Sequence, residues 1–156
     1  MTPRPAIRRR SSDAELLDAL VQLSFSIHDI LAQVAARHDV SVTQVRLFGT
    51  LRGREPAMSD LKDHLALEKS SVSGLIDRAE RRGLVVRTTG HPDGRAVHVR
   101  LTEQGAELAT RFADEVYAEL ETRLAPLSDR EQRRLLELAA QLGGPNRTQH
   151  LGREAV

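Results

Sequence analysis

The stretch from Ser59 to Thr102 changes its hydrophobic period part-way along, and that change constrains the fold more than any other feature of the chain. A short apolar segment opens it, with leucines at 61, 65 and 67. A longer segment follows, and its apolar residues take the i, i+3, i+4 and i+7 positions of one helix face: Val72, Leu75, Ile76 and Ala79. Gly83 comes next, where the end of a helix favours a residue that tolerates positive φ. The stretch therefore begins with two helices joined by a tight turn.

Beyond Gly83 the period falls from 3.6 to 2, which is the alternation of a strand. Residues 85–88 alternate, residues 90–94 are typical of a turn, and residues 96–101 alternate again, with Val97, Val99 and Leu101 on one face. Residues 57–58 are positioned to pair with this hairpin as a short edge strand. Two helices followed by a hairpin make a winged helix-turn-helix.

The polar residues of this stretch suit contact with DNA. Small hydroxyls and a lysine let the start of a helix approach base edges and phosphates closely, and the second helix opens with Lys69, Ser70, Ser71 and Ser73. Arg78 follows on the same helix, and Arg95 lies at the tip of the hairpin. Between residues 78 and 100, six arginines outnumber two acids, a balance of +4. The alternative is a small α+β module with an ordinary solvated face.

Two runs of residues carry a resemblance to a known family: SSVSGLIDRAERRGLVVR and HPDGRAVHVRLTEQG. An Asp-x-Arg hairpin followed by a Leu-Thr-x-x-Gly helix start resembles the pattern of the MarR family, the multiple-antibiotic-resistance-type regulators. The matching positions are Asp93, Arg95, Leu101, Thr102 and Gly105. The resemblance covers residues 12–142, nearly the whole chain. It departs from the family pattern at Gly74, where arginine is frequent, and at Glu68, where serine or threonine is frequent, and both departures bear on the operator sequence.

The resemblance implies a homodimeric transcription regulator that binds double-stranded DNA, and we expect it to be a repressor. We expect four residues at the start of the second helix to read bases in the major groove or to position the helix there: Lys69, Ser70, Ser71 and Ser73. We expect Arg78 to hold a phosphate. Arg95 is expected in or beside the minor groove, where negative potential favours arginine, with Asp93 orienting it through a charge-assisted hydrogen bond. The runner-up is a winged-helix module that binds proteins and has no DNA role.

Long amphipathic helices flank the DNA-binding stretch, and their apolar faces exceed what one winged-helix module can cover. We predict a mostly α (α+β) fold in a single domain. Residues 12–38 and 103–142 would form a helical dimerisation subdomain, and residues 41–102 the DNA-binding subdomain, with the recognition helix at about 69–82 and the wing at about 85–101. A two-fold dimer matches a pseudo-palindrome whose half-sites lie about 34 Å apart, or a multiple of that spacing.

Side-chain caps mark the expected helix starts. Capping boxes, in which a serine and a Glu or Gln three residues later satisfy each other's free N–H groups, begin at Ser12, Ser41 and Ser128. Thr102 caps the helix that follows the wing.

Composition excludes several classes of protein. The chain has no Cys, which excludes a thiol redox switch, a disulfide framework and a thiolate metal site. No apolar run approaches membrane-spanning length and the arginines at 8–10 precede no signal-peptide core, so we expect a cytoplasmic protein without a membrane partner. The net charge is only +1, but residues 103–142 carry nine acids against five arginines, which concentrates positive charge at the hairpin and the N-terminal tail.

No pattern for catalysis is present, because the chain has no nucleophile elbow, P-loop or dinucleotide fingerprint. The six histidines include no i, i+4 pair, so no metal or cofactor is expected, although a regulatory metal near His28 and His38 is an alternative. In the family resemblance, a small apolar or aromatic effector lies between the dimer subdomain and the winged helix. Here that region would be lined by Phe25, His28, Phe48 and Phe112. The alternative is that the phenylalanines are simply core.

Overall fold

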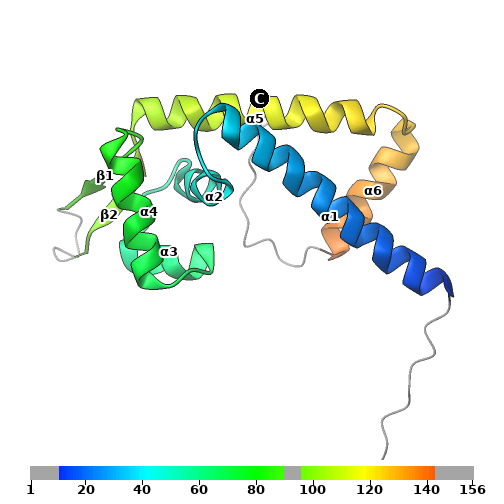
Figure 1. Ribbon diagram of the computed structural model, residues 1–156, viewed down its shortest axis with the longest axis horizontal. Helices are drawn as coiled ribbons and strands as arrows, with labels where there is room; N and C mark the ends of the chain where they lie inside the picture. The colour runs from blue at the N-terminus through cyan, green and yellow to red at the C-terminus, as the bar shows by residue number, and fades with distance from the viewer. Residues whose placement is uncertain (1–10, 90–95, 143–156) are drawn as a thin grey trace, which may run out of the picture.

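The computed structural model describes residues 11–89 and 96–142. Within those ranges the chain is mostly helical, with one small antiparallel sheet (Figure 1). The elements are α1 (Ser11–Arg37), α2 (Val42–Leu51), α3 (Met58–Leu65), α4 (Lys69–Arg81), β1 (Val85–Thr88), β2 (His98–Leu101), α5 (Glu103–Leu124) and α6 (Asp129–Leu142). The predicted fold class, a mostly α winged helix-turn-helix, is confirmed.

One continuous hydrophobic core joins the winged helix-turn-helix to the helices that flank it. The apolar faces of α2, α3 and α4 meet the sheet, and the last turns of α1 and the first half of α5 close over them. Ile30 and Val34 of α1 and Leu108 and Val116 of α5 belong to the same cluster as Ile76 of α4. The DNA-binding stretch is therefore held rigidly against α1 and α5 instead of hanging from a linker.

The wing is a two-stranded antiparallel sheet in which Val85 pairs with Leu101 and Thr88 with His98. The short edge strand expected at residues 57–58 is confirmed as an isolated bridge between Ala57 and His98. Its hydrogen bonds run from Met58 N to the Val97 carbonyl (2.8 Å) and from Val99 N to the Pro56 carbonyl (3.1 Å). This bridge ties the start of β2 to the start of α3.

Most of the expected helix caps are confirmed. The Ser41 side chain accepts from Gln44 N while Gln44 reaches back to Ser41 N, and Thr102 Oγ1 accepts from Gly105 N at 3.0 Å. Ser128 N donates to Glu131 Oε2 at 2.9 Å, and the hydrogen bonds from Ser128 lower the pKa of the Glu131 carboxyl. The box expected at Ser12 is wrong in its position, because α1 already begins at Ser11.

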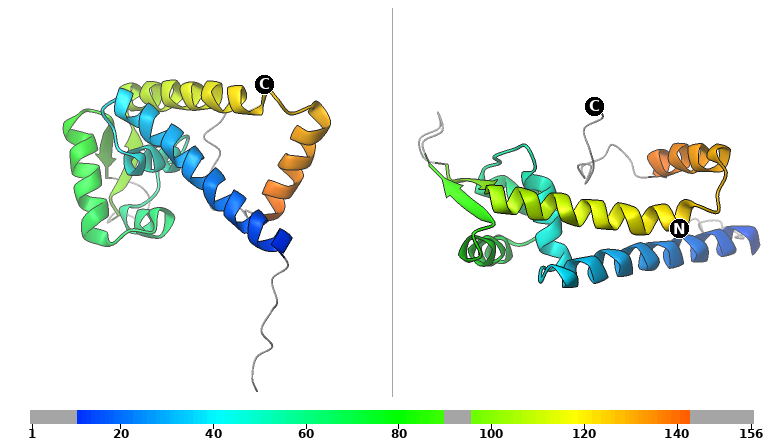
Figure 2. Two further views of the ribbon diagram at one scale, coloured as in Figure 1. Left: turned by 45° about the vertical axis from the view of Figure 1, so that its right-hand side comes forward. Right: turned by 90° about the horizontal axis from the view of Figure 1, so that it is seen from above.

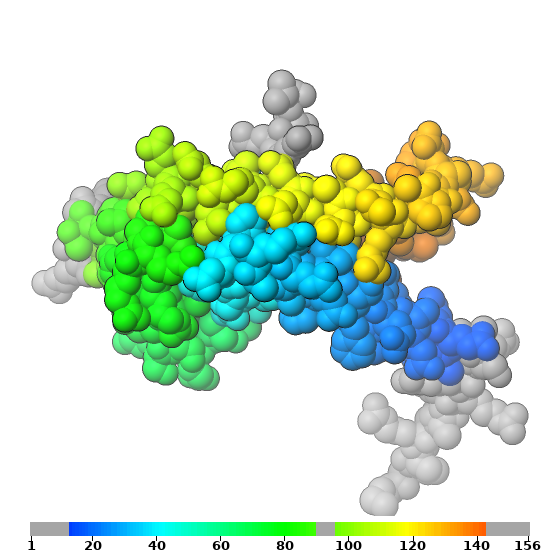
Figure 3. Space-filling model, turned by 45° about the horizontal axis from the view of Figure 1, so that its top comes forward, coloured from blue at the N-terminus to red at the C-terminus, as the bar shows by residue number. Residues whose placement is uncertain are grey.

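The first half of α1 and all of α6 extend beyond the core (Figures 1 and 2). No residue of α6 is buried. Large apolar side chains on these segments are exposed in the single chain, Phe25 by 59% and Leu136 by 71%. In the space-filling view the first half of α1 projects past the rest of the molecule (Figure 3). A soluble chain seldom leaves an apolar surface of this kind uncovered.

Residues 13–37 of α1 are long enough and apolar enough to cross a membrane, judged by length and composition alone. The expectation that no apolar run approaches membrane-spanning length is therefore wrong. These residues meet both criteria because the acids of this helix, such as Asp18 and Asp29, are few and the remaining polar residues are mostly uncharged. The last turns of the same helix enter the protein core, where Val34 and Ala35 are 0% and 1% exposed. An apolar helix with one end in a protein core is typical of packing between helices.

The turn between α3 and α4 contains a strained residue that leads to a first prediction. Ala66 has φ 53° and ψ 47°, and its N–H donates to the Lys62 carbonyl to close α3. The left-handed conformation costs a residue with a Cβ roughly 1–2 kcal/mol, and the freedom of glycine in the unfolded chain offsets about 0.4–1 kcal/mol of that. Ala66→Gly should therefore raise the free energy of unfolding by about 0.5–1 kcal/mol, measured by urea denaturation with an unchanged m-value.

The matched control for that substitution is Ala118→Gly, at an exposed position in the middle of α5. There the backbone is helical, so glycine should lower the stability by about 1 kcal/mol. If the two substitutions changed the free energy of unfolding in the same direction, the assignment of strain to Ala66 would be contradicted.

Candidate nucleic-acid interface

Helix α4 has one buried and one exposed face. Its buried residues recur at helical spacing and none is more than 2% exposed: Val72, Leu75, Ile76 and Ala79. They pack against Leu61 and Leu65 of α3, which lie in the same core. The opposite face is polar and open to solvent, and the sheet lies beside it at the end of the molecule remote from α6 (Figure 1). This is the face that a recognition helix presents to a groove.

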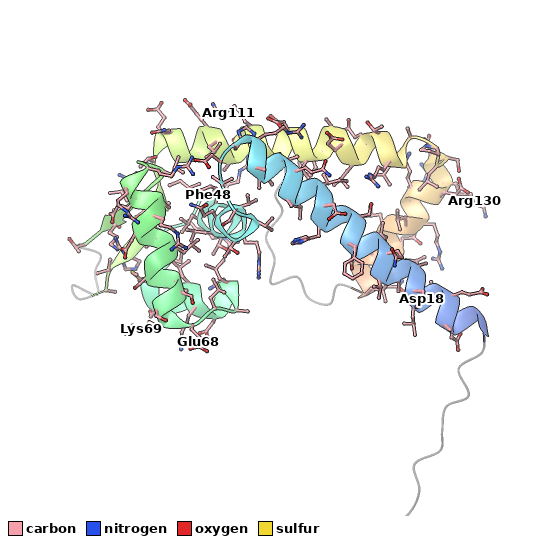
Figure 4. The ribbon with its side chains drawn as sticks, in the orientation of Figure 1. Asp18, Phe48, Glu68, Lys69, Arg111 and Arg130 are labelled. Carbon is pink, nitrogen blue, oxygen red and sulfur yellow. The ribbon has the colours of Figure 1, made fainter. Side chains whose placement is uncertain are left out.

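The start of α4 carries an acid beside a base. Glu68 is the N-cap residue and its side chain makes no capping hydrogen bond, while Lys69 begins the helix. Both side chains are exposed, and both lie at the end of α4 next to α3 (Figure 4). A serine or threonine at this position would accept from the free N–H groups of the first turn. With Glu68 instead, no side chain caps those N–H groups, but the carboxylate places a negative charge beside them.

The predicted DNA-contacting residues lie on two flanks of α4. Ser70, Ser71 and Arg78 line a hollow of about 310 Å³ together with Ser41 and Thr43, at the start of α2. On the other flank, a hollow of about 600 Å³ opens between α3, α4 and the start of β2, and two predicted residues, Lys69 and Ser73, line it. The helix thus stands as a ridge between two depressions, a shape suited to a groove of DNA. The other two predicted contacts, Asp93 and Arg95, lie outside the described residues.

Arg87 fastens the wing to the recognition helix, a role that the sequence pattern did not indicate. From β1 its guanidinium bridges the carboxylates of Asp77 and Glu80 on α4, and its backbone N–H donates to Glu80 Oε1 at 3.2 Å. The hydrogen bond to Asp77, together with the charges of both acids, raises the pKa of Arg87 above its usual value. The two acids of α4 are therefore neutralised from the wing side, and they repel DNA less than their exposure suggests.

Ion pairs reduce the positive charge that the sequence appears to offer. Arg82 pairs with Asp39 at 3.7 Å and Arg100 with Glu55 at 3.8 Å, in addition to the bridge made by Arg87. Arg81 Nε donates to the carbonyl of Asp77 at 3.3 Å. Arg78 is exposed and makes neither a hydrogen bond nor an ion pair with any other part of the described chain. The balance of +4 therefore overstates the charge that is free to meet phosphate.

The four predicted effector contacts are not brought together within one chain. Phe48, which Figure 4 labels, and Phe112 are each 2% exposed, and both line a space of only about 10 Å³ between α2 and α5. Phe25 and His28 lie on the exposed part of α1 and do not line that space. Ligand pockets measure roughly 300–1,000 Å³. In this conformation Phe48 and Phe112 therefore serve as core residues.

The histidines are likewise dispersed. His38 Nε2 lies 2.8 Å from Glu115 Oε1, and Arg37 Nε lies 3.2 Å from Glu115 Oε2, so the corner after α1 is tied to α5. Over residues 11–89 and 96–142, no group of three or more His, Asp or Glu side chains is arranged to hold a metal ion. The corner is therefore a structural junction between α1 and α5.

Comparison with known sequences identifies relatives of the DNA-binding stretch. A sequence model described as the MarR family matches residues 38–96. The homoprotocatechuate degradative operon repressor of Escherichia coli is 28% identical over 130 residues, which are 80% of this chain and 87% of that one. The HTH-type transcriptional regulator PecS of Dickeya dadantii is 26% identical over 127 residues, 79% of this chain and 76% of that one. These relatives are transcription regulators.

Solved structures share the arrangement of helices and wing. The structure of MarR from Escherichia coli in its apo form superposes with a TM-score of 0.69 at 22% identity, covering 81% of this chain and 96% of that one. NadR, solved in complex with 4-hydroxyphenylacetate, gives a TM-score of 0.61 at 25% identity and covers 93% of this chain and 100% of that one. The likeness extends over the flanking helices as well as the winged part.

Proposed function

We propose that this chain is a winged helix-turn-helix transcription regulator of the MarR family, and that it acts as a homodimeric repressor of a pseudo-palindromic operator, relieved by a small aromatic or apolar effector. The observation that carries the proposal is the ridge of α4, whose acids are neutralised by Arg87 and whose outer face is otherwise formed by small hydroxyls and free cations. A DNA-binding regulator of this kind works in the cytoplasm.

The exposed apolar surfaces of α1 and α6 support the homodimer. They lie at the end of the molecule opposite the recognition helix, so a second copy can cover them while both wings remain free (Figure 2). A two-fold axis through such an interface presents two recognition helices to one side of a duplex, at half-sites about 34 Å apart or a multiple.

We assign DNA contacts to both flanks of α4 and to the wing. Lys69, Ser70, Ser71 and Ser73 would meet the major groove from the start of the helix, where no side chain caps the N–H groups. Arg95 would meet the minor groove, oriented by Asp93, as the family resemblance implies. The alternative, a module that binds only proteins, is not favoured, because the relatives are DNA-binding regulators.

The effector we propose is a small aromatic acid or a similarly sized apolar molecule. A structural neighbour holds 4-hydroxyphenylacetate and a relative represses an operon for homoprotocatechuate breakdown, which supports this class of compound. Because the space between Phe48 and Phe112 is too small in one chain, the pocket would need either the second subunit or a movement of α2 against α5. An effector can release DNA only by binding the released conformation more tightly than the bound one.

Selection of bound fragments from the host genome tests the DNA-binding function directly. We expect the protein to enrich a small set of fragments that share a pseudo-palindrome. Enrichment of fragments without a common sequence would contradict a sequence-specific regulator, and failure to retain any duplex at low salt would favour the protein-binding alternative.

Once the operator is known, the salt dependence of binding separates phosphate contacts from base contacts. Arg95→Ala and Lys69→Ala should each weaken binding to operator and random duplex by similar factors and flatten the slope of log K against log salt by about one phosphate. Asp93→Ala should act like Arg95→Ala but less, because it removes only the orienting group. Fluorescence anisotropy at several salt concentrations measures both quantities.

Ser73→Ala is the matched uncharged substitution in that series. It should leave the salt slope unchanged and cost roughly 1–3 kcal/mol on the operator alone. If Arg95→Ala binds both duplexes like the parent, the wing makes no DNA contact and the protein-binding alternative becomes the better one.

A further inference from the structure

Gly74 and Arg78 form an unusual pair on the outer side of α4. They are four residues apart, so they are neighbours on the surface of one helix. Resting on the proposed function, we infer that Arg78 reads a base of the operator through the space that Gly74 leaves open, and does not merely hold a phosphate. Arg78 is thus a residue that determines operator specificity.

Nothing in the described part of one chain requires a glycine at position 74. Its backbone is helical, and a Cβ built there would approach a single group within 4 Å, Arg78 Nη1 at 3.4 Å. Glycine inside a helix costs about 1 kcal/mol relative to alanine. Among the described residues, the guanidinium of Arg78 is therefore the one neighbour that gains room from the missing side chain.

Arg78 is the arginine of α4 that has no partner within the described ranges. Its neighbours along the chain differ in this respect, since Arg81 donates to a carbonyl of its own helix and Arg82 pairs with Asp39. A long side chain on a helix leans toward the helix N-terminus. Consistent with this, the Arg78 guanidinium lies back over Gly74 and lines the same hollow as Ser70 and Ser71, the residues of the first turn.

This position brings a planar donor fork to the part of the helix that meets base edges. In winged helix and related motifs the N-terminal residues of the recognition helix contact the bases. A guanidinium can donate two parallel hydrogen bonds to O6 and N7 of guanine in the major groove from a rigid planar fork, whereas the lysine ammonium is a compact charge whose donors are not held in that geometry. Without a side chain at Gly74, the helix backbone can also come closer to the floor of the groove.

The substitution Arg78→Lys tests the inference because it keeps the charge and removes the fork. On the operator found by fragment selection, we expect affinity to fall about tenfold to a hundredfold. Affinity for a random duplex and the salt slope should stay within about twofold of the parent. Equal losses on both duplexes, or no loss on either, would overturn the base-reading role.

Arg81→Lys is the matched control, because Arg81 lies on the same helix but donates to the carbonyl of Asp77. It should leave the ratio of operator to random affinity unchanged. A second probe replaces single operator guanines with 7-deazaguanine, which lacks N7. Replacement of one particular guanine in each half-site should weaken binding of the parent protein. The same replacement should leave the affinity of the Arg78→Lys variant unchanged.

The role of Gly74 is tested by Gly74→Leu alone and combined with Arg78→Lys. Leucine is a good helix former and occupies the space in which the guanidinium lies. We expect Gly74→Leu to lower the affinity for the operator. Adding Arg78→Lys to that variant should lower the affinity by less than about twofold more, so the two effects should not be additive. Additive losses would show that Arg78 acts independently of Gly74. Circular dichroism melting confirms that each variant is folded.

The same experiment distinguishes this inference from the proposed function. A parent protein that binds operator and random duplex equally would contradict the proposed function itself. A parent that discriminates between them, with an Arg78→Lys variant that discriminates equally well, would overturn only the specificity role of Arg78.

Discussion

Phe25→Glu combined with Leu136→Glu should convert the protein into a folded monomer whose operator affinity falls on the order of 10²–10⁴-fold. Both side chains are more than half exposed in the single chain, so charging them removes no contact that one subunit needs in order to fold. In the proposed dimer the same positions would be covered by a second copy, where an unpaired carboxylate is costly to bury. The loss of affinity follows because two half-sites are then bound independently instead of together.

Sedimentation velocity measures the change in mass, and anisotropy on operator and half-operator duplexes measures the change in affinity. Gln22→Glu is the control, since it adds one negative charge to an exposed residue of α1 outside the apolar stripe and should leave a dimer. Deleting residues 128–156 should act in the same direction as the double substitution. A doubly substituted protein that stays dimeric, or a monomer that binds at full affinity, would refute the assignment of these faces to the subunit interface.

Gly105→Ala is the single substitution with the largest expected effect on folding. A Cβ at this position would lie 1.9 Å from the carbonyl oxygen of Leu84, which belongs to the backbone and cannot move aside like a side chain. The same carbonyl accepts a hydrogen bond from Thr102 N at 3.1 Å, and Thr102 Oγ1 donates to the Gly83 carbonyl at 2.6 Å. In the Gly105→Ala protein, the start of α5 must therefore move away from Leu84, the residue before β1. We expect a loss of roughly 2–4 kcal/mol in the free energy of unfolding.

For a chain of this length, such a loss lowers the melting temperature by about 5–15 °C. Gly53→Ala is the control that separates two possible causes. Gly53 has φ +65° but no atom within 4 Å of a built Cβ, so it should show the cost of backbone conformation alone, about 1 kcal/mol. If Gly105→Ala destabilises the protein no more than Gly53→Ala does, the close approach of the Leu84 carbonyl is not the reason that the start of α5 needs a glycine.

The sequence alone was sufficient for the elements of the DNA-binding stretch. The change of period after Gly83 predicted a helix followed by a hairpin, and α4 begins at Lys69, the residue from which the recognition helix was expected. The caps at Ser41, Thr102 and Ser128 were also correct. These signals are local: a cap depends on residues three apart, and a helix face on residues three or four apart, so the chain itself carries the information.

Contacts between elements were decided only by the tertiary structure. The bridge from Arg87 to Asp77 and Glu80 depends on how β1 docks against α4, and the count of arginines along the chain could not reveal that several are already paired. The Leu-Thr-x-x-Gly pattern was recognised, but the reason for Gly105, the carbonyl of Leu84, was not visible. Phe48, Phe112 and Phe25 look alike in the sequence, yet the first two are buried and the third is exposed. Whether a side chain is paired, buried or free depends on distances between elements, and these follow from packing the whole chain around one core.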